Sequence, residues 1–172
     1  MTDVETIRNA FERGAKAVMA RPAIGQKTYV TKVHVRDGLT SEIQERAWKL
    51  TADLMKKAGG NEAGPTPGTF ARAALGSCLA MSYVMWAANL DVPIARLEVE
   101  VYAHTDLRGM YGVAGIPAGY SDVRYVVSIE SSAPKAAIMQ VLDRAEAHSP
   151  YLDVFKRPQN LHRQVRLSGT KE

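Results

Sequence analysis

The chain has 172 residues, of which 46% are hydrophobic and 23% are charged, and its formal net charge is +4. This composition is typical of a single globular domain, and the length allows a hydrophobic core without metals or disulfides. The single cysteine excludes an internal disulfide and a cysteine-based zinc cluster, and such sparse cysteine use is typical of a reducing compartment.

The distribution of charged residues and the absence of binding motifs argue against several further classes of function for this chain. Lysine and arginine are scattered, without a basic run or an aromatic platform, so a nucleic-acid-binding module is only the weakest alternative. The four histidines lack the spacing of a metal site and no glycine-rich phosphate loop opens a helix, so we expect no metal and no cofactor. The N-terminus carries charged residues and no apolar run, which predicts no signal peptide and a cytoplasmic protein.

The N-terminal segment, residues 2–20, has the pattern of an amphipathic helix that ends at Arg21-Pro22. Its apolar stripe consists of Val4, Ile7, Phe11 and Val18. We therefore predict a helical extension over residues 1–24 and a single domain over residues 25–172.

A β-hairpin follows. Residues 29–36 alternate between apolar and polar side chains, which predicts a strand with one buried face. Asp37-Gly38 is a hairpin turn signal, and residues 42–50 read as the returning strand. Residues 53–63 are polar and glycine-rich, which is typical of a connection.

The stretch 64–90 is the most apolar part of the chain. Thr66 is a candidate N-cap with Pro67 at the first helical position, and residues 73–90 carry no charge. This length is close to that of a membrane-spanning helix, but alanine, glycine and serine dilute it, which favours a buried central helix. Apolar side chains nearly all round predict a sheet on one side and a partner subunit on the other, and hence an oligomer.

The second half of the chain alternates strands with a helix. Residues 97–104 and 123–130 read as strands that each have one exposed face. Residues 105–122, which contain four glycines, read as a mobile hairpin loop, with a lid over a site as the alternative. A second helix is predicted from Ser132 to Ser149.

Residues 151–158 read as a short irregular segment, and residues 161–167 as a final strand. Antiparallel strands packed on two helices give an α+β fold class.

Cys78 lies within the central helix. A lone cysteine on an apolar helix is most often a small buried hydrophobe, and the alternative is a reactive nucleophile. A free thiol is mostly protonated at neutral pH, so a reactive cysteine needs a neighbouring cation that favours the thiolate.

Four segments together resemble the OsmC/Ohr family, from about Thr28 to about Ser168. They are KVHVRDGLTSEIQERAWKLTADL, GPTPGTFARAALGSCLAMS, LEVEVYAHTD and AEAHSPY, of which the second is the most specific. The resemblance implies an OsmC-like fold, with an antiparallel sheet packed on two central helices in an intertwined homodimer. It also implies a thiol peroxidase that reduces organic hydroperoxides in oxidative stress defence.

The resemblance places the reactive thiolate at Cys78 and the arginine that activates it at Arg36. At two further positions the chain departs from the family. Gly68 stands where the resemblance implies the carboxylate that orients the arginine, and Ser149 stands where it implies the resolving cysteine. The carboxylates that could replace the missing one are Glu42, Glu98 and Glu100.

These residues lead to two hypotheses. In the first, Cys78 is a one-cysteine peroxidatic centre, assisted by Arg36 and recycled by an external thiol reductant. Its apolar pocket at the dimer interface is expected to include Phe70, Met81 and Tyr83. In the second, the protein is a non-catalytic OsmC-fold protein that binds a small apolar ligand at the same interface.

Overall fold

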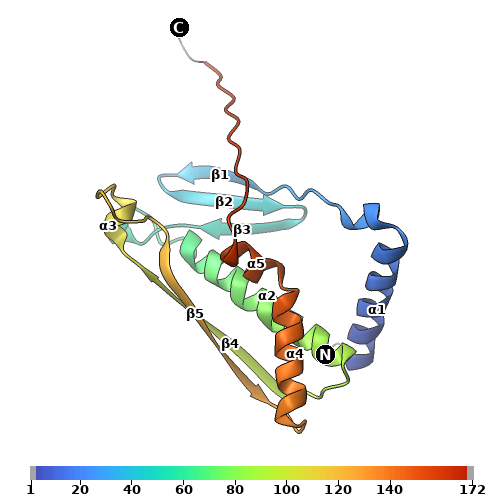
Figure 1. Ribbon diagram of the computed structural model, residues 1–172. Coiled ribbons are helices and arrows are strands. Elements are labelled where there is room, and N and C mark those ends of the chain that lie inside the picture. Colours follow the sequence, from blue (N-terminus) through green and yellow to red (C-terminus); the bar gives the residue numbers. More distant parts are fainter. Residues whose placement is uncertain (1–2, 170–172) are drawn as a thin grey trace.

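The computed structural model describes residues 3–169 and has a mixed α+β fold, so the predicted fold class is confirmed (Figure 1). Two separate antiparallel sheets are present, with strand orders β1-β2-β3 and β4-β5. The strands are β1 (Lys32–Asp37), β2 (Thr40–Glu45), β3 (Trp48–Ala52), β4 (Arg96–Thr105) and β5 (Tyr120–Glu130). The helices are α1 (Val4–Ala20), α2 (Pro67–Asn89), α3 (Leu107–Met110), α4 (Lys135–Ala147) and α5 (Pro150–Lys156), with short 3₁₀ turns η1 (Pro22–Gly25) and η2 (Lys56–Ala58).

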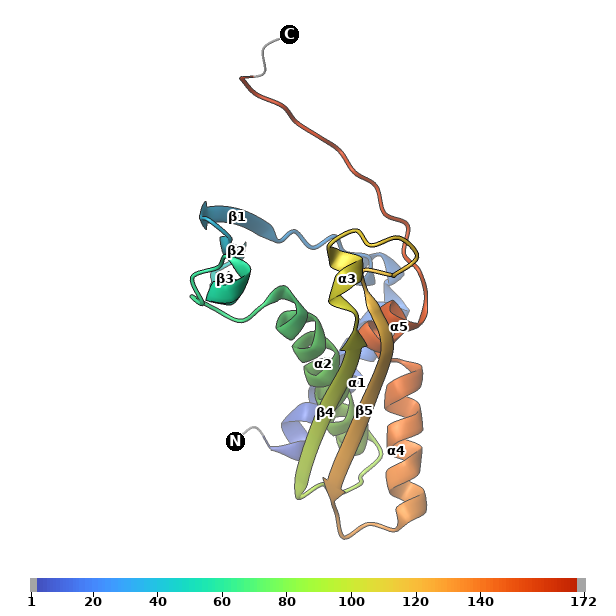
Figure 2. The same ribbon diagram turned by 90° about the vertical axis from the view of Figure 1, so that its left-hand side faces the viewer.

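Helix α2 is the centre of the fold. It packs against α1, α4, α5 and β4, and the β4–β5 ribbon runs alongside it (Figures 1 and 2). The buried core cluster consists of Leu75, Leu79, Tyr83, Ala145 and Leu152. A Cβ atom added at Gly76 would lie 3.2 Å from the Val101 side chain, so the glycine allows β4 to approach α2 closely. No helix among residues 3–169 is long and apolar enough to cross a membrane.

Several predicted elements are confirmed. Helix α1 falls within the predicted helix at 2–20, and its N-cap is Asp3, whose side chain accepts a hydrogen bond from the Thr6 amide. The paired strands β4 and β5 contain residues 97–104 and 123–130. The loop between them is ordered in part, because it includes the short helix α3. The division into an extension and a single domain stays a prediction.

The first sheet departs from its prediction in two ways. Residues 42–50 do not form one strand, because Arg46 adopts a left-handed conformation (φ 53°) and makes a turn between β2 and β3. The strand β1 has no buried face, since every one of its residues is exposed. The physical reason is visible in Figure 2, where the three-stranded sheet stands off the rest of the chain.

The C-terminal predictions were wrong at two places. Residues 151–158 are not irregular throughout, because Pro150 occupies the first turn of α5 and Ser149 caps this helix. The predicted strand at 161–167 is absent from the described part of the chain, where residues 157–169 are neither helix nor strand. Its apolar side chains are exposed, and no sheet edge of the same chain lies beside it to pair with (Figure 2).

A buried carboxylate fixes the connection between β3 and α2. The Asp53 carboxylate accepts hydrogen bonds from the Thr40 hydroxyl at 2.8 Å and from the backbone amides of Leu54, Asn61 and Ala63. Burial raises the pKa of Asp53, but these hydrogen bonds lower it more, so the net pKa lies below its ordinary value. Asp53 therefore joins the first hairpin to the segment that leads into α2.

We expect Asp53→Asn to lower the melting temperature at pH 7 by roughly 5 °C, because the amide cannot accept all of these hydrogen bonds. A lowered native pKa contributes stability above the unfolded pKa of about 3.9, and this contribution is lost as the pH falls through the native value. The melting temperature of the wild type should thus approach that of the variant in acid. Thermal unfolding between pH 7 and pH 3 checks this, with Asp143→Asn as the control because Asp143 is exposed on α4. A constant difference between wild type and Asp53→Asn at all pH values would contradict it.

Candidate active site

Helix α2 holds Cys78 at its centre. The helix begins where the Thr66 hydroxyl accepts a hydrogen bond from the Thr69 amide at 3.2 Å, with Pro67 in the first turn. Cys78 lies about three turns further on and is half-buried, next to the fully buried Leu79. The core therefore fixes the helix, while the thiol remains accessible in part.

The closest polar neighbour of Cys78 is Ser149. The Cys78 Sγ and Ser149 Oγ atoms are 3.6 Å apart, and Ser149 is only 2% exposed. The same hydroxyl accepts a hydrogen bond from the Leu152 amide and so caps α5. The structure thus brings together two residues that lie 71 positions apart in the chain.

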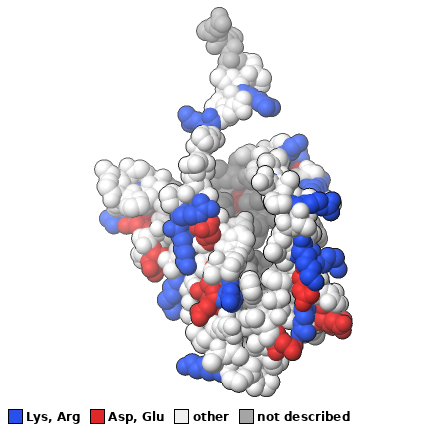
Figure 3. Space-filling view, turned by 45° about the vertical axis from the view of Figure 1, so that its right-hand side comes forward, with Lys and Arg blue, Asp and Glu red and all other residues white. Residues whose placement is uncertain are grey.

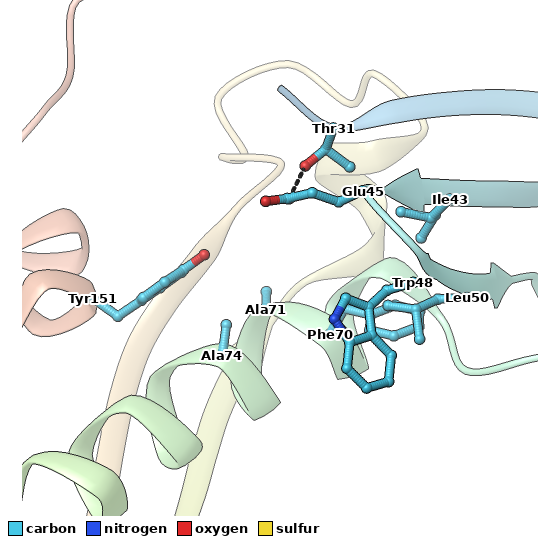
Figure 4. Close-up of a pocket in the computed structure, with 9 residues that line it drawn as sticks. All are labelled: Thr31, Ile43, Glu45, Trp48, Leu50, Phe70, Ala71, Ala74 and Tyr151. Atoms are coloured by element: carbon cyan, nitrogen blue, oxygen red, sulfur yellow. Dashed lines mark hydrogen bonds between the residues drawn. The ribbon is translucent and has the colours of Figure 1, made fainter. Parts of the chain in front are cut away.

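An open pocket of about 420 Å³ lies beside the N-terminal half of α2 (Figure 4). Its floor contains Ala71 and Ala74, which precede Cys78 by seven and four residues and therefore share its helix face. The full lining consists of Thr31, Ile43, Glu45, Trp48, Leu50, Phe70, Ala71, Ala74 and Tyr151. The pocket is thus formed by the first sheet, α2 and α5, and its floor lies on the helix face of Cys78, which is not itself among the lining residues.

The three residues predicted to line a pocket lie in different places. Phe70 lines the pocket, as seen in Figure 4. Met81 is 60% exposed on α2, one turn beyond Cys78. Tyr83 is completely buried and donates a hydrogen bond to Glu146 at 2.9 Å. A side chain without accessible surface cannot contact a ligand, so Tyr83 has no place in the site that we propose below.

Tyr83 instead supports α2 from the core side. Burial, with a smaller effect from Glu146, raises its pKa well above the ordinary tyrosine value. The same two causes raise the pKa of Tyr125 on β5 to about 12. Both phenols therefore stay protonated, and Tyr83 donates its hydrogen bond to Glu146 on α4.

Arg36 lies on β1 and pairs with Glu42 on β2, with 3.0 Å between Arg36 Nη2 and Glu42 Oε1. The hydrogen bond and the charge of Arg36 lower the pKa of Glu42. Of the three carboxylates predicted as replacements, Glu42 is thus the one that contacts Arg36. Glu98 pairs with Arg96, and Glu100 accepts a hydrogen bond from Tyr102.

Within one chain, Arg36 does not face Cys78. The pocket-lining residues of β2, Ile43 and Glu45, alternate with Glu42, so they lie on the opposite face of the sheet. Since Arg36 contacts Glu42, its guanidinium also lies on the face that points away from the pocket and from α2. The thiol and its predicted activator are therefore separated by the sheet.

In the described residues, no group of three or more His, Cys, Asp or Glu side chains could hold a metal ion. On the face shown in Figure 3, basic side chains lie among acidic ones and do not form a continuous basic patch.

The sequence profile of the OsmC-like protein family matches residues 59–162, which is more than half of the chain and includes Cys78 and Ser149. The chain belongs to the OsmC-like family. The family that the sequence resembles is thus confirmed, and α1 and the first sheet lie outside the matched range.

Solved structures of OsmC-like proteins have the same fold. An OsmC-like protein from Mycoplasma pneumoniae matches with a TM-score of 0.65 and 15% identity, over 76% of this chain and 89% of that one. An organic hydroperoxide resistance protein from Legionella pneumophila matches with a TM-score of 0.54 and 13% identity, over 76% and 90%. The organic hydroperoxide resistance protein OhrB of Bacillus subtilis matches with a TM-score of 0.50 and 17% identity, over 74% and 91%. The curated proteins include no match to this chain.

The resemblance to the OsmC/Ohr family implies a carboxylate at the position that Gly68 occupies in this chain. A Cβ atom at Gly68 would lie 3.3 Å from Arg72 Nη1 and 3.4 Å from the Tyr120 hydroxyl. Arg72 donates to that hydroxyl at 3.3 Å, and Tyr120 donates to the Gly68 carbonyl at 3.1 Å. In this chain an arginine and a tyrosine thus close the space beside the first turn of α2.

Sequence reasoning missed the aromatic walls of the pocket, Trp48 and Tyr151, and its only charged residue, Glu45. The sequence predicts one strand through Glu45 and Trp48 without a turn, which puts the two side chains on opposite faces, whereas they are paired partners in the structure. Tyr151 fell in the segment predicted to be irregular. Strand alternation already places Ile43 and Glu45 on one face, and a turn recognised after Glu45 would have placed Trp48 and Leu50 on that face as well.

Proposed function

We propose that this OsmC-like protein is a thiol-dependent organic hydroperoxide reductase in which Cys78 is a one-cysteine peroxidatic centre. The observation that carries the proposal is the position of Cys78, half-buried on the α2 face whose alanines floor an apolar pocket. Two proteins of the same fold are named organic hydroperoxide resistance proteins, which supports a role in oxidative stress defence. We assign the protein to the cytoplasm, where thiol reductants are available.

The first step consumes one hydroperoxide. The Cys78 thiolate attacks one oxygen of the peroxide, the O–O bond breaks, and a sulfenic acid and an alcohol form after uptake of one proton. The alkyl part of the substrate packs against Phe70 and the other apolar walls of the pocket, with Met81 on the far side of the thiol.

The second step needs a reductant from outside. The chain has no second cysteine, and the Ser149 hydroxyl beside Cys78 cannot form a disulfide. An external thiol therefore condenses with the sulfenic acid and releases water, and a second thiol reduces the mixed disulfide.

Arg36 acts in this proposal from a second copy of the chain. Within one chain the guanidinium faces away from the thiol, so a homodimer is needed to place a partner's guanidinium next to it. Exposed apolar side chains next to the pocket support association, since Val33 and Val35 on β1 are exposed and are not among the pocket-lining residues. A guanidinium beside the thiol favours the thiolate and cannot lose its own proton.

The competing function is a non-catalytic protein that binds a small apolar ligand. The absence of a side chain at Gly68 favours this function. The space beside Gly68 holds Arg72, so this position of α2 offers no carboxylate that could orient Arg36. Glu42 supplies such a carboxylate from the same sheet as Arg36, which is why we rank the reductase first.

Turnover with an external thiol tests the proposal. We expect the wild type to consume cumene hydroperoxide in the presence of dithiothreitol, and Cys78→Ser to lose roughly 100-fold or more of this rate, because a hydroxyl is a far poorer nucleophile. Ser77→Ala, one residue away on the exposed side of α2, is the control. Equal rates for the wild type and Cys78→Ser would instead favour the non-catalytic function.

A further inference from the structure

The contact between Cys78 and Ser149 is complete within one chain. Ser149 Oγ lies 3.6 Å from Cys78 Sγ, and Ser149 is only 2% exposed. The nearby side chains of Ala145 and Leu152 belong to the buried core cluster. Because so little of Ser149 is accessible, neither a ligand nor a second copy of the chain can replace Cys78 as the neighbour of this hydroxyl without moving the core.

The Ser149 hydroxyl has a fixed position between two helices. The Ser149 amide donates to the Glu146 carbonyl at 3.4 Å, and the Ser149 carbonyl accepts a hydrogen bond from the Asp153 amide at 3.0 Å. The Oγ atom itself accepts a hydrogen bond from the Leu152 amide at 3.4 Å. Since α4 and α5 both pack against α2, the hydroxyl is held beside Cys78 before any substrate arrives.

The direction of the hydrogen bond between the two side chains follows from where the hydrogens are. The Leu152 amide already supplies Ser149 Oγ with a hydrogen, and in the described residues Cys78 Sγ is the only acceptor within hydrogen-bond distance of this hydroxyl. A thiolate carries no hydrogen and can only accept. The Ser149 hydroxyl therefore donates to the ionised sulfur, and because a hydrogen bond to an ion is stronger than one to a neutral group, it favours the thiolate.

We propose that Ser149 is a second catalytic residue of this site, whose hydroxyl donates a hydrogen bond to the Cys78 thiolate and so increases the fraction of the nucleophile. The inference rests on the proposed function, in which this thiolate attacks the peroxide, and it adds a donor from the same chain. Arg36 acts in that function from the second copy, so the loss of one donor should not remove the effect of the other.

The single cysteine of the chain gives a direct readout, because a thiolate absorbs in the ultraviolet where a thiol does not. The absorbance that full alkylation by iodoacetamide removes therefore measures the thiolate of Cys78 alone. We expect Ser149→Ala to lower this absorbance at pH 7, and to slow the alkylation, by roughly fivefold or more, because a hydrogen bond to a charged group is lost.

Ser149 also caps α5, so two further variants separate its effect on the sulfur from its effect on the helix. Ser149→Gly removes the hydroxyl, but glycine caps a helix nearly as well as serine, so this variant should lose as much thiolate as Ser149→Ala. Leu152→Ala weakens the packing of α5 and leaves the hydroxyl in place, so it should keep the thiolate of the wild type.

Equal thiolate absorbance in the wild type, Ser149→Ala and Ser149→Gly would overturn the inference. An equal loss in Leu152→Ala would also overturn it, because the effect would then belong to the position of α5. Neither readout uses a peroxide, so failure here is distinguishable from failure of the proposed function. A protein that follows the expected order but whose Cys78 is never oxidised would refute the reductase and leave the hydrogen bond from Ser149 to the thiolate intact.

Discussion

Replacing Arg36 with alanine is expected to slow the oxidation of Cys78 by an organic hydroperoxide by roughly 10- to 100-fold, because the thiolate loses its neighbouring cation. The Arg36–Glu42 pair is largely exposed, so its loss should leave the melting temperature nearly unchanged. The rate is measured from the mass of the protein at timed intervals after peroxide addition. Arg96→Ala removes a matched exposed pair, Arg96–Glu98, and should leave the rate unaltered.

Mixed dimers decide whether Arg36 acts across the interface. Chains that carry Arg36→Ala are co-expressed with chains that carry Cys78→Ser. If Arg36 serves the thiol of the other chain, each mixed dimer has one intact site, and random pairing restores about a quarter of the wild-type activity. If Arg36 serves its own chain, no intact site forms and the mixture stays as slow as Arg36→Ala alone. This second result would contradict the proposed arrangement.

Replacing Leu79 with alanine is expected to lower the free energy of unfolding by about 3 kcal/mol. Leu79 is completely buried in the core cluster with Leu75, Tyr83, Ala145 and Leu152, where the removed methyl groups leave a cavity. Urea unfolding followed by circular dichroism measures the change.

Leu107→Ala is the matched control, since Leu107 is 61% exposed on α3 and should change the free energy of unfolding by less than about 1 kcal/mol. Equal effects at the two leucines would contradict the view that the core around α2 carries the stability of the chain.

The central helix was the most predictable element of the fold. Thr66 and Pro67 mark its start with local hydrogen-bond chemistry, and these signals hold in any tertiary context. The strands β4 and β5 were equally clear, because one face of their ribbon packs on the core around α2 and the other is wet, which favours alternation of apolar and polar side chains.

The turn between β2 and β3 escaped prediction because Arg46 adopts a positive φ, and no glycine or asparagine announces it. The prediction of a final strand at residues 161–167 was wrong for a different reason. Residues 161–167 have the alternation of a strand, but a strand also needs a pairing edge, and the described chain offers none there. Local pattern could not supply that information.

The candidate site was predictable in part. Helical spacing placed Cys78 on α2, and the resemblance named the position of Ser149, which lies beside the thiol. The pocket could not be predicted, because it depends on how the first sheet stands relative to α2 and α5. Trp48, Glu45 and Tyr151 come from three separate elements, and only the tertiary arrangement brings them together.

The most direct test of the central claim is the intact mass of the reduced protein after brief exposure to one equivalent of cumene hydroperoxide. We predict a rapid gain of one oxygen atom in the wild type and no gain in Cys78→Ser, because Cys78 is the residue that attacks the peroxide. A folded wild-type protein that keeps its reduced mass under these conditions would contradict the claim that Cys78 is a peroxidatic centre.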